Sequence, residues 1–494
     1  MKQTSKSLVT TLGFLVVAGA IAGAAFWVQK DVTKEETKKE KAAKVFDGLD
    51  RTKVREIRVT KEGKLLAAAT RPDDKASWKL VDPIQADADA TQIDAMVTAI
   101  ADLRQKSDIG EGDLKQYGFD PPRIAATLKL DDGKEQSLEI GETNPFDNTI
   151  YVRKGGEKTV RVADGWAKSP FEKTLLDLRD KRVVHLDDGT EIRRIEVSGT
   201  KPPYTLEKDG TAWKLLAPQP GPGDSGTADR IGSALRNLRA TGIAAESADA
   251  KALKQYGLAP PKVEVRLSVA PAGGKESFRR VILLGQPAPT AGSVAVKTYA
   301  KRDDSPAVFE VDGQILKDLG KDLFDLQDKS LVHVDREAVR KIVFDQPSAP
   351  KIVVARKKDQ APDAGFADET FTVVEPKEAP AKKWKVSSAL YSITGLRAAS
   401  FGGKLEKNEP KLGLSRTVTL LGDGDKVLAR VRIGAETKDG KRRYVAVDGE
   451  PRYAEVEKVS VDDLPKTLDD VLEPPPAPSG ADGGTKLQAS NPGK

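Results

Sequence analysis

Ser225 is the residue whose sequence neighbours most suggest catalysis. It lies in the run Gly221-Pro-Gly-Asp-Ser-Gly226, and Gly-Asp-Ser-Gly surrounds the nucleophile of chymotrypsin-like proteases. Such a serine needs a histidine base and a buried aspartate behind it. The chain has two histidines, His185 and His333, at matching positions of an internal repeat. We therefore expect the histidines to serve the fold, and hydrolysis through Ser225 stays the last alternative.

The same run also reads Gly-x-Gly-x-x-Gly between an expected strand and an expected helix, where a dinucleotide phosphate would bind. Pro222 removes an amide that could face a phosphate. The flanking pattern does not predict a parallel β-α-β unit, and the matching run of the first repeat, Pro83-Ile-Gln-Ala-Asp87, has no glycine. We expect a flexible loop here.

Two groups of acidic residues could contact Ca²⁺: Asp87-x-Asp89-x-Thr91 and Asp423-x-Asp425. Neither has the glycine and distal glutamate of an EF-hand loop. Helix capping by Asp89 or Thr91 and a hairpin turn at Asp423 explain them better. The absence of cysteine excludes disulfides, thiolate zinc sites and thiol catalysis. We predict no catalytic, metal-binding or cofactor-binding residue.

The net charge of +6 could suggest nucleic-acid binding, but its distribution does not. Residues 1–44 hold eight lysines and four acidic residues, which accounts for +4 of the total. The other 450 residues carry about +2 with both signs interspersed, whereas a nucleic-acid interface concentrates its basic residues. We expect no nucleic-acid partner and no small-molecule substrate.

One phrase organises the chain. Leu114-Lys-Gln-Tyr-Gly-Phe-Asp-Pro-Pro122 returns as Leu253-Lys-Gln-Tyr-Gly-Leu-Ala-Pro-Pro261, and a degenerate copy runs from Glu409 to Arg416. Other landmarks recur in the same order: Trp78, Trp213 and Trp384; Gly141, Gly285 and Gly434; Tyr151, Tyr299 and Tyr444. The glycines are 144 and 149 residues apart. A period near 145 indicates three tandem modules, each with its own core.

Each module is expected to be a mainly antiparallel α+β unit with two or more helices. In the first module, alternation predicts strands near 54–59, 65–70, 124–130, 137–140, 149–152 and 159–162. Helical spacing predicts a helix at Thr91–Leu103 and a closing helix at Phe171–Asp180. The insertion at 357–369 in the third module reads as a loop.

The repeated landmarks suit structural roles. The glycine after tyrosine fits a positive φ at a helix end, and the paired prolines direct the chain into a strand. The three tryptophans are each expected to start a strand and cap a module core. His185 and His333 are expected to pack at the junctions between modules.

The segment at residues 7–28 contains no charged residue and is long enough for a transmembrane helix. A signal peptide cleaved after Ala22-Gly-Ala24 is the alternative. The anchor is favoured because the apolar run exceeds a typical signal core. Six lysines between 30 and 44 oppose an exterior C-terminus under the positive-inside rule, so charge does not decide the orientation.

These expectations divide the chain as follows: a flank at 1–6, the transmembrane helix or signal peptide at 7–28, a charged stalk at 29–44, module 1 at 45–188, module 2 at 189–337, module 3 at 338–473 and a disordered tail at 474–494.

The combined landmarks resemble the bacterial DUF4340 family over about residues 50–472: Trp-Lys-Leu, a helix, Tyr-Gly-Leu-x-x-Pro, Ile-Gly and Leu-x-Asp-Lys. Module 3 departs from the pattern because it lacks the tyrosine before Gly413. The resemblance implies one N-terminal membrane segment, an extracytoplasmic repeat region and frequent proximity to gliding-motility-type ABC-transporter components. It implies no activity and no catalytic residue.

We therefore expect a non-enzymatic structural or interaction protein, anchored by a single pass in the bacterial inner membrane with the bulk of the chain extracytoplasmic. Its expected partner is an ABC-type or other envelope complex. The first alternative is a module that binds envelope or cell-wall polysaccharide through exposed Trp and Tyr. The second is a hydrolase.

Overall fold

A computed structural model describes residues 44–474, with gaps at 187–188, 272–273, 275–276, 289–295 and 359–368. The expected anchor, stalk and tail, and most of the insertion at 357–369, lie outside the described residues. Within them, no helix is both long enough and apolar enough to cross a membrane.

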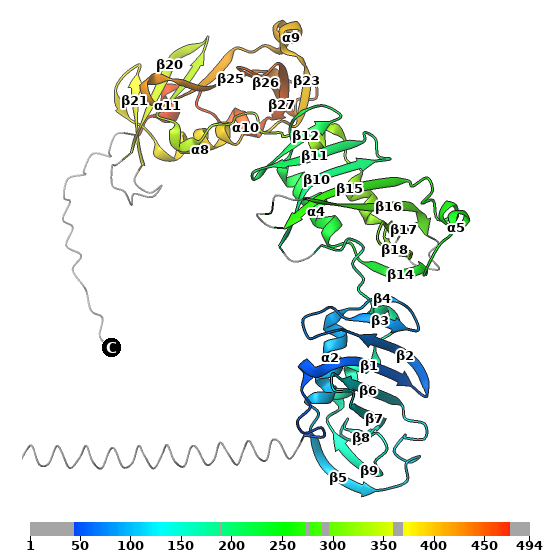
Figure 1. Cartoon of the computed structure of the whole chain (residues 1–494). Helices are drawn as coiled ribbons and strands as arrows, with labels where there is room; N and C mark the ends of the chain where they lie inside the picture. Colours follow the sequence, from blue (N-terminus) through cyan, green and yellow to red (C-terminus); the bar gives the residue numbers. More distant parts are fainter. Residues whose placement is uncertain are drawn as a thin grey trace, which may run out of the picture. The chain divides into compact units, whose positions relative to one another are not determined.

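The described chain builds three nine-stranded antiparallel sheets in tandem (Figure 1). Their strand orders are β4-β3-β2-β1-β6-β7-β8-β9-β5, β13-β12-β11-β10-β15-β16-β17-β18-β14 and β22-β21-β20-β19-β24-β25-β26-β27-β23. All three follow one scheme: four strands, a helix, one strand that crosses to the far edge, and a four-strand return. This confirms the tandem antiparallel repeats.

The first sheet contains β1 (Val54–Lys61), β2 (Lys64–Thr70), β3 (Lys79–Asp82), β4 (Ala86–Asp87), β5 (Gln105–Glu111), β6 (Ile124–Leu130), β7 (Glu135–Thr143), β8 (Ile150–Lys154) and β9 (Thr159–Ala163). The second contains β10 (Thr190–Ser198), β11 (Tyr204–Asp209), β12 (Ala212–Ala217), β13 (Gly221–Pro222), β14 (Ala240–Ala245), β15 (Val263–Pro271), β16 (Phe278–Ala288), β17 (Lys297–Arg302) and β18 (Val308–Asp312). The third contains β19 (Lys341–Gln346), β20 (Ala349–Lys358), β21 (Glu369–Glu375), β22 (Ala379–Pro380), β23 (Ser400–Lys404), β24 (Arg416–Leu421), β25 (Val427–Glu436), β26 (Arg442–Val447) and β27 (Arg452–Glu457).

Contacts divide the described chain into two compact units, and their boundary passes through the second sheet. One unit includes residues up to 188 together with 234–264 and 280–315; the other includes 189–233, 265–279 and residues from 316 onward. Module 1 and its junction with module 2 lie within the first unit, and module 3 and its junction with module 2 lie within the second.

Helices are few. The three long ones each have 12 residues and occupy the same place in their modules: α2 (Ala90–Ala101), α4 (Ser225–Arg236) and α8 (Lys383–Thr394). The other α-helices are α3 (Leu175–Leu178), α5 (Ala250–Gln255), α6 (Gln314–Leu319), α7 (Leu323–Leu326), α9 (Leu405–Leu412), α10 (Val459–Asp462) and α11 (Leu468–Val471). Short 3₁₀ helices are η1 (Arg51–Lys53), η2 (Gly165–Glu172), η3 (Arg336–Ala338) and η5 (Asp423–Asp425).

The predicted helix of module 1 is confirmed as α2. Asp89 caps it by accepting a hydrogen bond from the amide of Gln92, as one of the two predicted caps should. The face with helical spacing, Ile93, Met96, Val97 and Ile100, is buried in the core of the first module. Helical periodicity was therefore a sound guide here.

The predicted closing helix at Phe171–Asp180 is wrong in extent. Glu172 ends the 3₁₀ helix η2, which contains Pro170, and Thr174 then caps the four-residue α3 with a capping box to Asp177. The backbone is extended at Lys173 and Thr174, with ψ angles of 157° and 165°, so the helix is interrupted there and the cap at Thr174 starts a new turn. The apolar residues have helical spacing, but they are divided between two short helices, η2 and α3.

The turns at the repeated Tyr-Gly motif, and at its degenerate copy Leu412-Gly413, have the predicted backbone. Gly118, Gly257 and Gly413 have φ angles of +79°, +67° and +60°. A second glycine packs against each turn: a Cβ atom at Gly285 would lie 2.1 Å from the carbonyl oxygen of Tyr256, and one at Gly141 only 2.0 Å from that of Tyr117. The Tyr-Gly and Ile-Gly landmarks are thus two sides of one close backbone contact.

Candidate functional site

The segment that joins modules 1 and 2 is hydrogen-bonded on both sides. Toward module 1, the amide of Asp180 donates to the carbonyl of Asp87 at 2.9 Å, and that of Asp89 donates to Leu178 at 2.9 Å. Toward module 2, the amide of Val183 donates to Leu238 at 3.0 Å and that of Ala240 to Lys181 at 2.7 Å. We call residues 178–183 and these partners the first joint.

The second joint, residues 326–331, repeats this pattern 148 residues later. Asp328 donates to Pro222 at 3.0 Å and Leu331 donates to Leu396 at 2.9 Å. The carbonyls of Leu326 and Lys329 accept from Asp224 at 2.9 Å and Ala398 at 2.7 Å. The sequence Leu-x-Asp-Lys at both places therefore marks a connection that backbone hydrogen bonds fix to both neighbouring modules.

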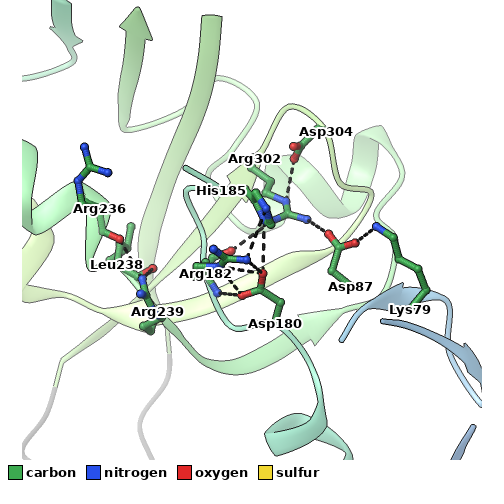
Figure 2. A network of polar contacts seen from close by, with 10 residues as sticks. All are labelled: Lys79, Asp87, Asp180, Arg182, His185, Arg236, Leu238, Arg239, Arg302 and Asp304. Carbon is green, nitrogen blue, oxygen red and sulfur yellow. Dashed lines mark hydrogen bonds and ion pairs between the residues drawn. The ribbon is translucent and has the colours of Figure 1, made fainter. Parts of the chain in front are cut away.

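Side chains reinforce the first joint (Figure 2). Arg182 donates to both carboxylate oxygens of Asp180, with its closest contact at 2.6 Å. Nδ1 of His185 lies 3.3 Å from the same carboxylate. Burial acts to raise the pKa of Asp180, but the hydrogen bonds and charge of Arg182, with a smaller contribution from His185, outweigh it and hold the pKa below its usual value.

Arg302, at the end of β17, connects the two modules of this joint. It donates to Asp87 of β4 at 3.1 Å and to the backbone carbonyl of Arg182 at 3.2 Å, and Asp304 pairs with it at 2.7 Å. Lys79 binds the other oxygen of Asp87. Burial raises the pKa of Asp87, but the bonds from Lys79 and Arg302 reverse this effect and lower it.

A cavity of about 380 Å³ lies beside these contacts. The residues around it include Gln85 and Val81 of module 1 and Ser305 and Pro306 of module 2. Buried Arg179 and Glu246 also line it and pair with each other, with Nη1 of the arginine 2.6 and 2.8 Å from the two carboxylate oxygens. Arginines bound to carboxylates by charge-assisted hydrogen bonds are suited to holding two sheet edges together.

Different side chains hold the modules together at the second joint. Asp224 caps α4 through the amide of Thr227 at 2.8 Å and also receives Arg397 of module 3 at 2.9 Å. Lys329 lies 3.8 Å from it. His333 corresponds to His185 and lies 4.0 Å from Asp328. Both histidines are thus found directly beside the joints, where the repeat had placed them.

Two of the three tryptophan predictions are confirmed. Trp78 is 1% exposed and Trp213 is buried; their indole nitrogens donate at 2.8 Å to Asp94 and Asp229 of the following helices. Trp78 directly precedes β3, and Trp213 lies in β12.

The third tryptophan prediction is wrong. Trp384 does not start a strand: it is the second residue of α8 and is 66% exposed. The residue that corresponds to Trp78 is buried Phe371 of β21, whose carbonyl accepts from Ala381 as that of Trp78 accepts from Ala88. The match of Trp-Lys-Val to Trp-Lys-Leu misled because it followed local sequence rather than position relative to the helix.

The run around Ser225 is not a loop, contrary to the prediction. Gly221 and Pro222 form edge strand β13, which pairs with β12, and Ser225 begins α4. Oγ of Ser225 accepts the backbone amide of Trp213 at 3.2 Å. The hydroxyl thus ties the helix start to the neighbouring strand.

The acidic pairs also have structural partners. Asp423 and Asp425 form the predicted turn between β24 and β25 and pair with Arg340 and Lys341, each at 2.7 Å. Among the described residues, no group of three or more His, Asp or Glu could hold a metal ion.

The outer face of α8 distinguishes module 3. Trp384 and Tyr391 are 66% and 52% exposed, and the guanidinium of Arg336 stacks 3.6 Å from the centre of the tyrosine ring. Sequence reasoning missed this face because it assigned Trp384 to the core; the spacing of seven residues between the two aromatics was the available signal.

The family described as "Domain of unknown function (DUF4340)" matches residues 78–251, 213–370 and 372–479. The first match contains the first joint and the second contains the second joint. The first two matches begin at the buried tryptophans, Trp78 and Trp213. No curated protein matches, and no solved structure matches.

Proposed function

This chain belongs to the DUF4340 family, and from that premise we propose that it is a membrane-anchored, extracytoplasmic interaction protein that docks a protein of an ABC-type envelope complex. The apolar stretch at residues 7–28 supports the anchor. The connected modules support a role in which the array displays a binding surface to a partner protein. The observation that carries docking is the exposed aromatic face of α8.

This face is specific to one copy of the repeat. The second and ninth residues of the corresponding helices are Thr91 and Thr98 in α2, and Gly226 and Ser233 in α4. A residue that the fold requires is needed in every copy, but here two copies have small residues and one has Trp and Tyr. The aromatics of α8 therefore serve something other than the fold.

The composition of the face suits protein recognition. Trp, Tyr and Arg are the residues that most often dominate binding energy at interfaces. Residues seven apart lie on one side of a helix, so both rings can enter one complementary groove. Arg336 already stacks on Tyr391, which reduces the ordering that binding would require.

The alternatives find less support. Burial of Trp78 and Trp213 removes the repeated stacking surface that polysaccharide binding would use. The remaining repeated aromatics, Tyr117 with Tyr151 and Tyr256 with Tyr299, pack against each other with centroids 4.7 and 4.6 Å apart. For a hydrolase, the Ser225 hydroxyl is engaged with the amide of Trp213.

Recovery of partners from gently solubilised membranes tests the proposal. The tagged full chain should co-purify with a membrane complex that contains an ABC-type ATPase. With the double variant Trp384→Ala/Tyr391→Ala, the amount of the complex recovered should fall at least about tenfold. Truncation of a hot-spot residue costs about 2 kcal/mol or more of binding free energy. The matched control Thr91→Ala/Thr98→Ala changes the same helix positions in module 1 and should retain it.

Recovery of the wild-type chain alone would contradict the proposal. Equal recovery of the complex by the α8 double variant would contradict the assignment of this face.

A further inference from the structure

The two edges of the first sheet have different neighbours in the chain. Its β4 edge passes the chain to module 2 through the first joint, and its β5 edge lies at the opposite side of the sheet (Figure 1). Lys44, the first described residue, forms a bridge to Arg104 directly before β5, and Val45 donates to Leu103 at 2.8 Å. In modules 2 and 3 the corresponding place is taken by a joint from the preceding module. In module 1 this place is taken by Lys44, which follows residues 1–43 in the sequence.

Two large aromatic side chains are exposed near this edge. Phe146, in the turn between β7 and β8, is 95% exposed, and Trp166, at the start of η2, is 61% exposed. Their segments touch, because a Cβ atom at Gly165 would lie 2.0 Å from the carbonyl oxygen of Asn148. Gln105, next to the bridge of Lys44, pairs with Ala163, three residues before Trp166. One end of module 1 thus holds both aromatics and the start of the described chain.

The other modules do not repeat these aromatics. The position of Trp166 holds Gln314 in module 2 and Val459 in module 3, and the turn position of Phe146 holds Asp439 in module 3. Because the fold is built without them elsewhere, Phe146 and Trp166 are additions to module 1.

We propose that the end of module 1 that carries Phe146 and Trp166 inserts these two side chains into the headgroup region of the lipid bilayer. This rests on the membrane anchor of the proposed function. Fifteen residues separate position 28 from Lys44, which limits the separation of module 1 from the apolar stretch to about 50 Å. Aromatic side chains are favoured at the membrane–water interface, and a tether raises their local concentration there.

Charge does not drive this contact. Lys106 pairs with Asp164 at 2.5 Å and Lys168 with Glu172 at 3.3 Å, so the nearby cations are matched by carboxylates. The contact should therefore form on uncharged phosphatidylcholine and persist at high salt, unlike a polybasic membrane site.

The absence of cysteine permits a direct test on the full chain. Phe146→Cys, labelled with an environment-sensitive nitrobenzoxadiazole probe, is reconstituted in phosphatidylcholine vesicles with or without brominated lipid. The control is Asp439→Cys, at the same turn position in module 3. The fluorescence emission of the probe at 146 should shift to shorter wavelength and be quenched by the brominated lipid. The emission of the probe at 439 should show neither change. Independently, Trp166→Phe should reduce the bromine-quenched share of tryptophan emission.

A probe at 146 that behaves like the one at 439, on chain that floats with the vesicles, would overturn the lipid contact and leave the anchor standing. Protection of the probe in native membranes but not in vesicles would overturn it in favour of a protein contact. Chain that does not float with the vesicles would overturn both the contact and the anchor.

Discussion

Trp78 and Trp384 are one residue type with opposite environments. Trp78 fills the core of module 1 and gives its indole hydrogen to Asp94, whereas Trp384 lies on the surface of α8. Phe371 fills the corresponding core position of module 3 without a polar group to satisfy. Identity in the sequence was therefore a weaker guide than position relative to the helix.

Truncation of these two tryptophans should give opposite results. Trp78→Ala should lower the free energy of unfolding of module 1 by about 3–5 kcal/mol, because it leaves a large cavity. Trp384→Ala should change the stability of module 3 by less than about 0.5 kcal/mol. Hydrogen exchange of the amides in α2 and α8 measures both. Equal losses at the two positions would contradict the assignment of Trp384 to the surface.

The first joint should weaken in acid. The pKa values of Asp87 and Asp180 are below 3.8 in the folded joint, so ionised carboxylates stabilise it. That stabilisation is present above pH 3.8 and is lost as the pH falls through the lower folded pKa values. Spin labels at Lys75→Cys and Lys251→Cys, in the two modules of the first unit, should show a distance distribution that broadens in this range.

Asp87→Asn supplies the control for acid weakening. It removes the charge that Arg302 and Lys79 bind, so the distribution should already be broader at neutral pH and change less on acidification. Emission from buried Trp78 and Trp213 reports whether the modules stay folded. A distribution that is unchanged by acid while the modules are intact would show that the backbone bonds alone hold the joint.

At the scale of elements, the glycine contact behind each Tyr-Gly turn sets how closely two segments approach. Gly285→Ala would place a Cβ atom 2.1 Å from the carbonyl oxygen of Tyr256, which forces the turn away from β16. We expect a loss of about 1–3 kcal/mol in stability, measured by urea unfolding and by exchange of the β16 amides. Gly221→Ala, where no atom lies within 4 Å, should be nearly neutral. A neutral Gly285→Ala would contradict the contact.

Much of the sheet could be predicted from alternation. β6, β7, β8 and β9 lie at the ranges predicted as strands, near 124–130, 137–140, 149–152 and 159–162. The crossing strands β5, β14 and β23 were missed. Their sequences, QKSDIGE, ATGIAA and SFGGK, have no such alternation, because each lies at a sheet edge with one neighbouring strand. Partners far away in sequence define these strands.

The candidate sites were harder to predict. The joints bring together Asp87 and Arg302, which are 215 residues apart, and no local pattern links them. The repeated Leu-x-Asp-Lys phrase did indicate that something structural recurs there. The exposed pair on α8 was visible only as a spacing of seven, and its significance depended on knowing which residues occupy the same helix positions in the other copies.

At the scale of the whole molecule, the repeated features have a different role from the features that occur in one module. Repeated features, such as the glycine turn before β6, β15 and β24 and the backbone hydrogen bonds of the two joints, build the array. Features present in one module, the aromatics of α8 and those at the β5 edge of module 1, are the ones that we assign to partners and lipid. The assignment of α8 to an envelope partner requires that the modules lie outside the cytoplasm.

The location of the modules is the most direct test of this account. A cysteine at exposed Glu450 in module 3 would be the single thiol of the chain. In spheroplasts, whose inner membrane is intact, a membrane-impermeant maleimide should label Glu450→Cys, as an anchored extracytoplasmic array requires. Labelling only after that membrane is permeabilised would place the modules in the cytoplasm, where the lysines at 30–44 would hold them, and would contradict the account.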